Sequence, residues 1–190
     1  MAQTIHISVD NLNEDFLDNI KEQYPNASLE IKVKTTATKE GLKDVEFWEI
    51  IDLLDWSKNQ SDELIIKPAI AALAAKKMRH IYEFQDFLSE KLFLLDTKIH
   101  AQNVGENNYI NEATYFSVDE FLYARCCVVA NGKTVFKTVL QAATKMPKNL
   151  TFEAILSIAR KAYKLKTGKT LTYQPKFNIE TFANKKGWKV

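Results

Sequence analysis

The apolar residues between about residues 79 and 99 recur at steps of three and four, and this pattern restricts the fold more than any other. Such steps place side chains on one face of an α-helix, so the segment predicts a long helix that buries one side. The chain also holds only five glycines in 190 residues, and a fold built from many tight turns needs more. The sequence therefore favours a mainly helical protein. The residues of the stripe are Ile81, Phe84, Leu88, Leu92, Leu95 and Ile99.

Other segments after residue 44 show helical patterns. Ser117 and Glu120 have the spacing of a capping box, in which both side chains bond free amides at a helix start. Asn131-Gly132 and Gly168 are typical of helix ends. Residues 103–114 form a polar loop. Helices are predicted for residues 44–56, 68–77, 117–130, 133–145 and 151–167, and Ser61 could start an earlier turn of the second helix that kinks at Pro68.

The first 35 residues show a different pattern. Residues 4–9 and 28–33 alternate polar and apolar side chains, which predicts strands, and Asn13 can cap a helix over residues 14–23 between them. Two strands alone are marginal in water, and residues 170–173 are a candidate third strand. The predicted fold class is α+β and predominantly α-helical, with a small N-terminal β-α-β element packed on a multi-helix domain.

These patterns divide the chain into four parts. Residues 1–35 form the β-α-β element, and residues 36–43 form a linker. Residues 44–147 form a helical domain. Residues 148–190 form a basic helix and tail that pack on this domain, because Phe182 and Trp188 in the tail favour docking.

Charge is divided by position. Residues 131–190 hold 13 basic and 2 acidic residues, whereas residues 1–130 hold 13 basic and 22 acidic ones. A basic surface of this kind suits nucleic acid or an acidic protein. The alternative is that it faces the acidic part of the same chain or of a dimer partner, and the near-neutral total favours this alternative. The basic residues concerned are Arg160, Lys161, Lys164, Lys166 and Lys169.

Arg125 is the most unusual residue of the predicted helices, because it lies in an apolar segment. A buried guanidinium is costly unless it is paired, so we expect a carboxylate partner or a bound anion. Asp86, Asp96 and Asp119 are the candidate carboxylates. A structural ion pair between helices is favoured over a ligand site. His100 follows Asp96 by four residues, which predicts a solvated helix pair.

The sequence gives little support for a metal site, a cofactor site or a catalytic nucleophile. The three histidines lie far apart and none has a second ligand at metal-binding spacing, so neither a metal nor a cofactor is expected. Cys126 and Cys127 are interpreted as small core residues. No signal peptide and no apolar run long enough to span a membrane is visible, so we expect a cytoplasmic protein.

Residues 47–147 resemble a bacterial family known as domain of unknown function 4240. The resemblance rests on Phe47-Trp48-Glu49-Ile50-Ile51, on Ser117-Val118-Asp119-Glu120-Phe121-Leu122-Tyr123-Ala124-Arg125, and on Gly132-Lys133 and Pro147. It implies a helical domain in which the arginine is a fixed feature, and it brings no known activity. The chain departs from the family pattern at Val118, where the family tends to have an acid.

Three functions follow as hypotheses. The first is a non-enzymatic binding or interaction protein of the bacterial cytoplasm, with a second copy or an acidic protein as its partner. The second is an enzyme of unrecognised type, in which Arg125 binds an anionic substrate and Asp96, Asp119 or His100 act as acid–base groups. The third is nucleic-acid binding through the basic C-terminal segment, which the near-neutral total charge favours less.

Overall fold

The computed structural model describes residues 5, 12, 14–31, 41–58 and 61–189. The chain forms two compact units, residues 1–39 and residues 40–190. In the first unit, α1 (Glu14–Gln23) has no buried residue among those described. The second unit contains the core and the sites described below.

The predicted β-α-β element is wrong, because the described residues contain no strand. Residues 28–31 lie outside any ladder, and Leu29 and Ile31 are 55% and 60% exposed. Most of the predicted strand at residues 4–9, and residues 32–33, lie outside the described residues. A strand needs a partner for its amides and carbonyls, and alternation alone does not supply one. Residues 170–173 are likewise extended without pairing. The predominantly helical prediction is confirmed.

Helices build the second unit, and the longest carries the predicted apolar stripe. Ile81, Phe84 and Leu92 of that stripe are fully buried. The helix ends at Leu94 instead of Ile99, which is exposed on the next short helix. The α-helices are α2 (Asp44–Ile51), α3 (Asp62–Ala75), α4 (Met78–Leu94), α5 (Lys98–Ala101), α6 (Val118–Ala130), α7 (Gly132–Gln141), α8 (Ile158–Thr167) and α9 (Lys185–Trp188), and the 3-10 helices are η2 (Trp56–Lys58), η3 (Ala143–Lys145) and η4 (Glu153–Ser157).

The core lies between these helices. α3 packs along α8, and α4 packs against both α6 and α8. Phe47 of α2 contacts Phe84 of α4, with ring centroids 5.0 Å apart. Phe121 of α6 is also buried. Helices α6 and α8 therefore cover one face of α4.

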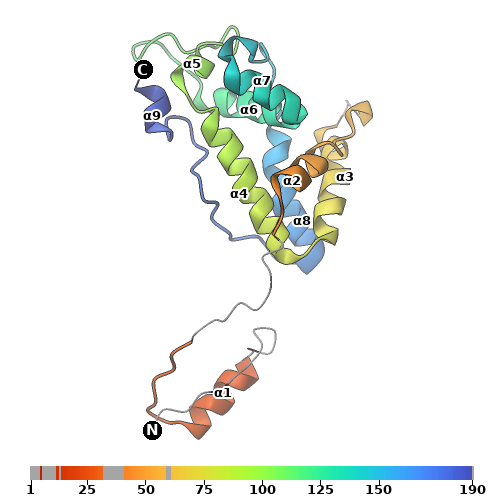
Figure 1. Ribbon diagram of the computed structural model, residues 1–190, viewed down its shortest axis with the longest axis vertical. Coiled ribbons are helices and arrows are strands. Elements are labelled where there is room, and N and C mark those ends of the chain that lie inside the picture. The colour runs from red at the N-terminus through yellow and green to blue at the C-terminus, as the bar shows by residue number, and fades with distance from the viewer. Residues whose placement is uncertain (1–4, 6–11, 13, 32–40, 59–60, 190) are drawn as a thin grey trace. The chain divides into compact units, whose positions relative to one another are not determined.

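Another side of α4 is covered by residues 169–189, which we call the C-terminal strap. After α8 the strap runs as extended chain beside α4 and ends in α9 (Figure 1). Its side chains alternate between half-buried and exposed along residues 171–180. Tyr173 stacks on Tyr82 of α4 at 4.8 Å, and Phe177 contacts Phe93 at 5.3 Å. These contacts dock the tail on the helical unit.

Candidate functional site

Arg125 of α6 lies beneath the C-terminal strap and is 0% exposed. Its Nη1 donates to the carbonyl of Leu92 at 2.9 Å. Its Nη2 donates to the carbonyl of Ile179 at 3.0 Å and to the hydroxyl of Thr181 at 3.1 Å. The guanidinium carbon also lies 4.7 Å from the centroid of the Phe121 ring. Arg125 thus joins α4, α6 and the strap through neutral oxygens.

The expected ion pair of Arg125 does not form among the described residues. Desolvation lowers the pKa of Arg125, and the charge of Asp96 acts in the opposite direction from a longer distance. Its Nε has no hydrogen-bond partner. The carbonyl of Leu92 in α4, and the carbonyl of Ile179 and the hydroxyl of Thr181 in the strap, take the place of the expected carboxylate.

Asp96 follows the end of α4 and is also 0% exposed. Its Oδ1 accepts hydrogen bonds from the amide of Phe182 at 3.2 Å and from Nε1 of Trp188 at 2.8 Å. Its Oδ2 accepts one from the amide of Asn184 at 2.9 Å. N–H donors that bond an ionised oxygen compensate its desolvation. All three donors belong to the strap.

Asp86 of α4 makes a similar set of contacts near the other end of the strap. Its carboxylate accepts from the Tyr173 hydroxyl at 3.0 Å and from the Lys176 amide at 3.0 Å. It also pairs with Nζ of Lys176 at 2.9 Å, and this contact raises the pKa of Lys176. We call Asp86, Asp96 and Arg125 the clamp, since together they fix the strap along its length.

His100 and Asp119, the other predicted site residues, lie elsewhere. His100 is buried, with Nε2 3.1 Å from the carbonyl of Val139 and Nδ1 2.7 Å from the hydroxyl of Thr97. Burial lowers the pKa of His100, so the imidazole stays neutral and donates to the carbonyl. The predicted solvated pair with Asp96 is absent. Asp119 is exposed in the first turn of α6 and has no contact with Arg125.

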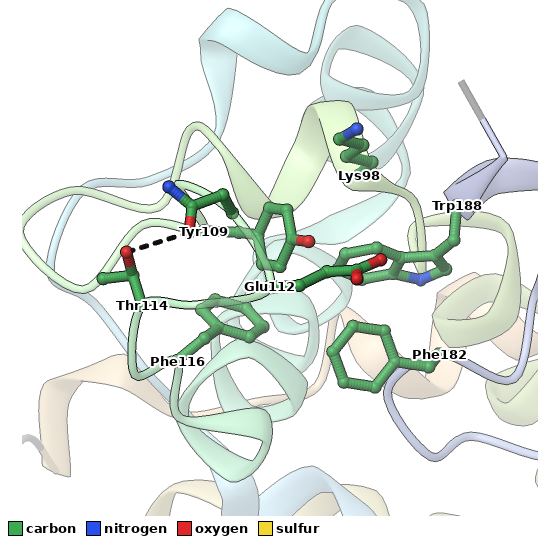
Figure 2. Close-up of a pocket in the computed structure, with 8 residues that line it drawn as sticks. Lys98, Tyr109, Glu112, Thr114, Phe116, Phe182 and Trp188 are labelled. Carbon is green, nitrogen blue, oxygen red and sulfur yellow. Dashed lines mark hydrogen bonds between the residues drawn. The ribbon is translucent and has the colours of Figure 1, made fainter.

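An open pocket of about 430 Å³ lies where the end of the strap meets the loop before α6. Rings from both segments meet there: Phe182 and Trp188 are 4.4 Å apart, and Tyr109 lies 5.3 Å from Trp188. Figure 2 shows these rings around one hollow, together with the side chain of Glu112. We call it the aromatic pocket; its lining is Lys98, Tyr109, Asn111, Glu112, Thr114, Phe116, Phe182 and Trp188.

Phe182 reaches the pocket from a strained backbone. Its φ is 72°, a left-handed value that bulky residues rarely adopt. The bond from its amide to Asp96 holds it in this conformation. Strained residues of this kind cluster at binding and catalytic sites, which marks the pocket as a candidate functional site.

Exposed apolar side chains stand next to pocket-lining residues in the sequence, Tyr115 between Thr114 and Phe116 and Ile110 between Tyr109 and Asn111. Tyr115 is 89% exposed and Ile110 is 59% exposed. We call the aromatic pocket together with Ile110 and Tyr115 the recognition surface. Sequence reasoning took residues 103–114 as a polar loop and missed this site. The available signal was the aromatic content of residues 109–116, which is unusual for a polar connection.

The basic residues of α8 and the strap divide into two groups. Lys161 pairs with Glu63 of α3 at 2.7 Å, and Nζ of Lys166 donates to the carbonyl of Ala74 at 3.1 Å. Arg160, Lys164 and Lys169 are exposed and form no ion pair with the described residues. Part of the basic segment therefore covers the same chain, and part faces solvent.

Other chemical centres are not evident in the part of the chain that the structure describes. Within it, no group of three or more His, Cys, Asp or Glu side chains is placed to hold a metal ion. Cys126 and Cys127 are buried, and burial raises the pKa of both thiols. None of the described helices is long and apolar enough to cross a membrane.

The fold and the site define a helical domain that carries a clamped C-terminal strap. Residues 42–165 match the family model described as a protein of unknown function, DUF4240. The chain therefore belongs to this family. The match extends beyond the predicted residues 47–147, includes nearly all of α8 and contains the whole clamp, but it ends before the strap. No curated protein and no solved structure matches the chain.

Proposed function

We propose that this chain is a non-enzymatic binding protein of the bacterial cytoplasm, and that it recognises another protein through its recognition surface. The observation that carries the proposal is the aromatic pocket, built by two segments far apart in sequence, together with the almost fully exposed Tyr115 between its lining residues Thr114 and Phe116. Aromatic residues are enriched at protein interfaces, where they supply much of the binding energy. Clustered exposed apolar residues mark interaction sites.

The charges near the pocket indicate what the partner carries. Residues 105–120 contain four acidic and no basic residues: Glu106, Glu112, Asp119 and Glu120. The strap contributes Lys185, Lys186 and Lys189 on the side of α9. A partner with both basic and acidic groups around an apolar centre complements this arrangement, and such complementarity sets orientation and association rate.

The environment of Arg125 supports binding over catalysis. The enzyme hypothesis needs Arg125 to face a substrate, but its guanidinium is enclosed and bonded to carbonyls. Asp119 and His100 do not converge on it. The discriminating measurement is turnover by the purified protein: activity that is lost in a folded Arg125→Ala variant would overturn the proposal.

Photo-crosslinking from the recognition surface tests the proposal directly. A photoreactive amino acid replaces Tyr115 in producing cells, and Leu165 of α8, which is 65% exposed, serves as the matched control position. We expect one discrete protein adduct from position 115 and none from position 165. The identified partner, once purified, should bind the wild type and lose at least tenfold affinity with Tyr115→Ala. Equal adducts at both positions, or binding unaffected by Tyr115→Ala, would refute the proposal.

Nucleic-acid binding is a second candidate, favoured by Arg160, Lys164 and Lys169, which are exposed and have no ion pair within the part of the chain that the structure describes. Fluorescence anisotropy of labelled DNA and RNA at about 50 and 200 mM salt measures it, because phosphate contacts weaken markedly over this range. Binding that falls with salt and is lost on charge reversal at Arg160 and Lys164 would support this candidate. Lack of binding at the lower salt concentration would eliminate it.

A further inference from the structure

The C-terminal strap lies on the core without entering it. Every described residue from Tyr163 to Lys189 is half-buried or exposed, whereas buried residues continue through Ala162 of α8. Departure of this segment would uncover Arg125 and Asp96, but it would remove no buried side chain from the apolar core. The strap is therefore separable from the domain on which it lies.

The contacts of the strap are those of a peptide bound in an extended form. Main-chain groups of the strap make hydrogen bonds to all three clamp residues: the amides of Lys176, Phe182 and Asn184, and the carbonyl of Ile179. Alternate side chains such as Tyr173 and Phe177 pack on the aromatic rings of α4. Main-chain bonds for affinity and alternate side-chain contacts for specificity are the usual mode of extended-peptide recognition.

The clamp groups depend on this segment for their partners. Every hydrogen bond to the Asp96 carboxylate comes from the strap, and so do the Tyr173 and Lys176 contacts of Asp86. The clamp lies within residues 42–165, which match the family, and the strap lies outside them. The clamp and the rings of Tyr82 and Phe93 in α4 thus form the surface that binds the strap. We call this surface the groove.

The strap that binds this groove can also come from another copy of the chain. Gly168 ends α8 at a φ of 73°, and a Cβ built there would meet no atom within 4 Å. The joint between α8 and the strap is therefore open, and Lys169 and Thr170 beyond it are exposed. Extended chain spans roughly 3.3 Å per residue, so residues 169–184, which precede α9, reach at most about 50 Å, which is far enough to enter the groove of a neighbouring molecule.

We propose that the clamp is a binding groove for the C-terminal strap of a second copy, so that two copies exchange straps. Exchange reproduces every contact of the closed chain and is a low-cost route to dimers. It also makes each aromatic pocket a shared site, with Tyr109 and Phe116 from one copy and Phe182 and Trp188 from the other. The chain's own strap competes for the groove, because its attachment to α8 gives it a high effective concentration there. Exchange therefore increases with protein concentration, and it also increases when the chain's own strap binds its groove more weakly.

Complementation between two full-length variants tests the exchange. Asp96→Asn weakens the groove, because either orientation of the amide turns an N–H toward a strap donor. It leaves the residues of the strap unchanged. Trp188→Ala spoils the strap and leaves the clamp intact. We expect each variant alone to sediment as a monomer, and an equimolar mixture to form a heterodimer in which the intact strap occupies the intact groove.

The control mixture pairs Asp96→Asn with Lys189→Ala, whose exposed side chain lies outside the clamp. Its own intact strap fills its groove, so we expect no heterodimer. A heterodimer that forms as readily in this control as in the test mixture, or no heterodimer in the test mixture when both variants show native circular dichroism, would overturn the exchange.

A labelled peptide of residues 169–190 provides a second measurement that does not depend on dimer formation. We expect it to bind the Trp188→Ala protein at least tenfold more tightly than the wild type, because a free groove removes the competing strap. Binding to the Asp96→Asn protein should be lost. Equal binding to all three proteins would refute the groove. Tyr115→Ala should change neither heterodimer formation nor peptide binding. A failure of the proposed partner binding therefore leaves strap exchange standing, and a failure of strap exchange leaves the proposed partner binding standing.

Discussion

Replacement of Asp96 by asparagine is the sharpest test of how the strap is held. The change is nearly isosteric, but it removes the charge and one of two acceptor oxygens. A hydrogen bond to a charged group contributes about 1.5–3 kcal/mol, and a buried unpaired donor costs a similar amount. Asp96 accepts three bonds from the strap. Loss of one bond and weakening of the others amounts to about 3 kcal/mol, or roughly a hundredfold change in the equilibrium for strap opening.

Amide hydrogen exchange measures this opening residue by residue. We expect protection of the Phe182 and Asn184 amides to fall about a hundredfold in Asp96→Asn, while core amides of α6 stay protected, because the strap opens locally. Asp119→Asn is the matched control, since it makes the same chemical change at an exposed aspartate. Unchanged protection in the strap would refute the role of Asp96, and an equal loss throughout α6 would refute a separable strap.

Three further predictions concern the core and the clamp. Arg125→Lys should destabilise the protein by about 2–4 kcal/mol in urea unfolding, because an ammonium cannot reach the oxygens of α4 and the strap together; a change below 0.5 kcal/mol would contradict this geometry. Phe47→Ala, at a fully buried ring, should cost about 3–5 kcal/mol in thermal unfolding, whereas Val45→Ala on the exposed face of α2 should cost little. His100 has a lowered pKa in the fold, so the unfolded chain takes up a proton first as pH falls below about 6.5. Stability should therefore decrease from pH 7 toward pH 5, and His100→Gln should reduce this slope; an identical slope would exclude His100 as its source.

Helices were predictable from the sequence because their signals are local. The stripe through Ile81, Phe84 and Leu92 specifies both a helix and its buried face, and Ser117 caps α6 as its spacing indicated. The end of α4 was not predictable. Ile99 continues the three- and four-residue pattern, but Asp96 turns inward to meet the strap, and such a contact has no local signature.

Alternating patterns misled the prediction for a physical reason. Alternation reports that one side of an extended chain is covered, but it does not say what covers it. Residues 171–180 alternate and pack on helix α4 without any ladder, and residues 28–31 alternate and stay exposed. A strand also needs a neighbour for its main-chain groups, which a short sequence window does not reveal.

The candidate site was predictable only in part. Arg125 was recognisable because a guanidinium in an apolar helix must be compensated, and Asp96 was among its expected partners. The two residues act on the same segment, but they bond separate strap groups and form no ion pair with each other. Carbonyls as partners leave no trace in the sequence, because every residue has one. The aromatic pocket was missed since its two halves are separated by more than sixty residues.

The extended form of the strap also has a consequence for turnover in the cell. Proteases cut extended, exposed chain most readily, whereas a helix must first open. Lys169 and Lys176 offer tryptic sites in the extended part of the strap, and cleavage tracks the population of the opened form when opening is fast. Reciprocal exchange, which keeps both straps bound, therefore lengthens the lifetime of the intact chain, whereas a partner that takes the clamp and displaces the strap leaves that strap open to trimming.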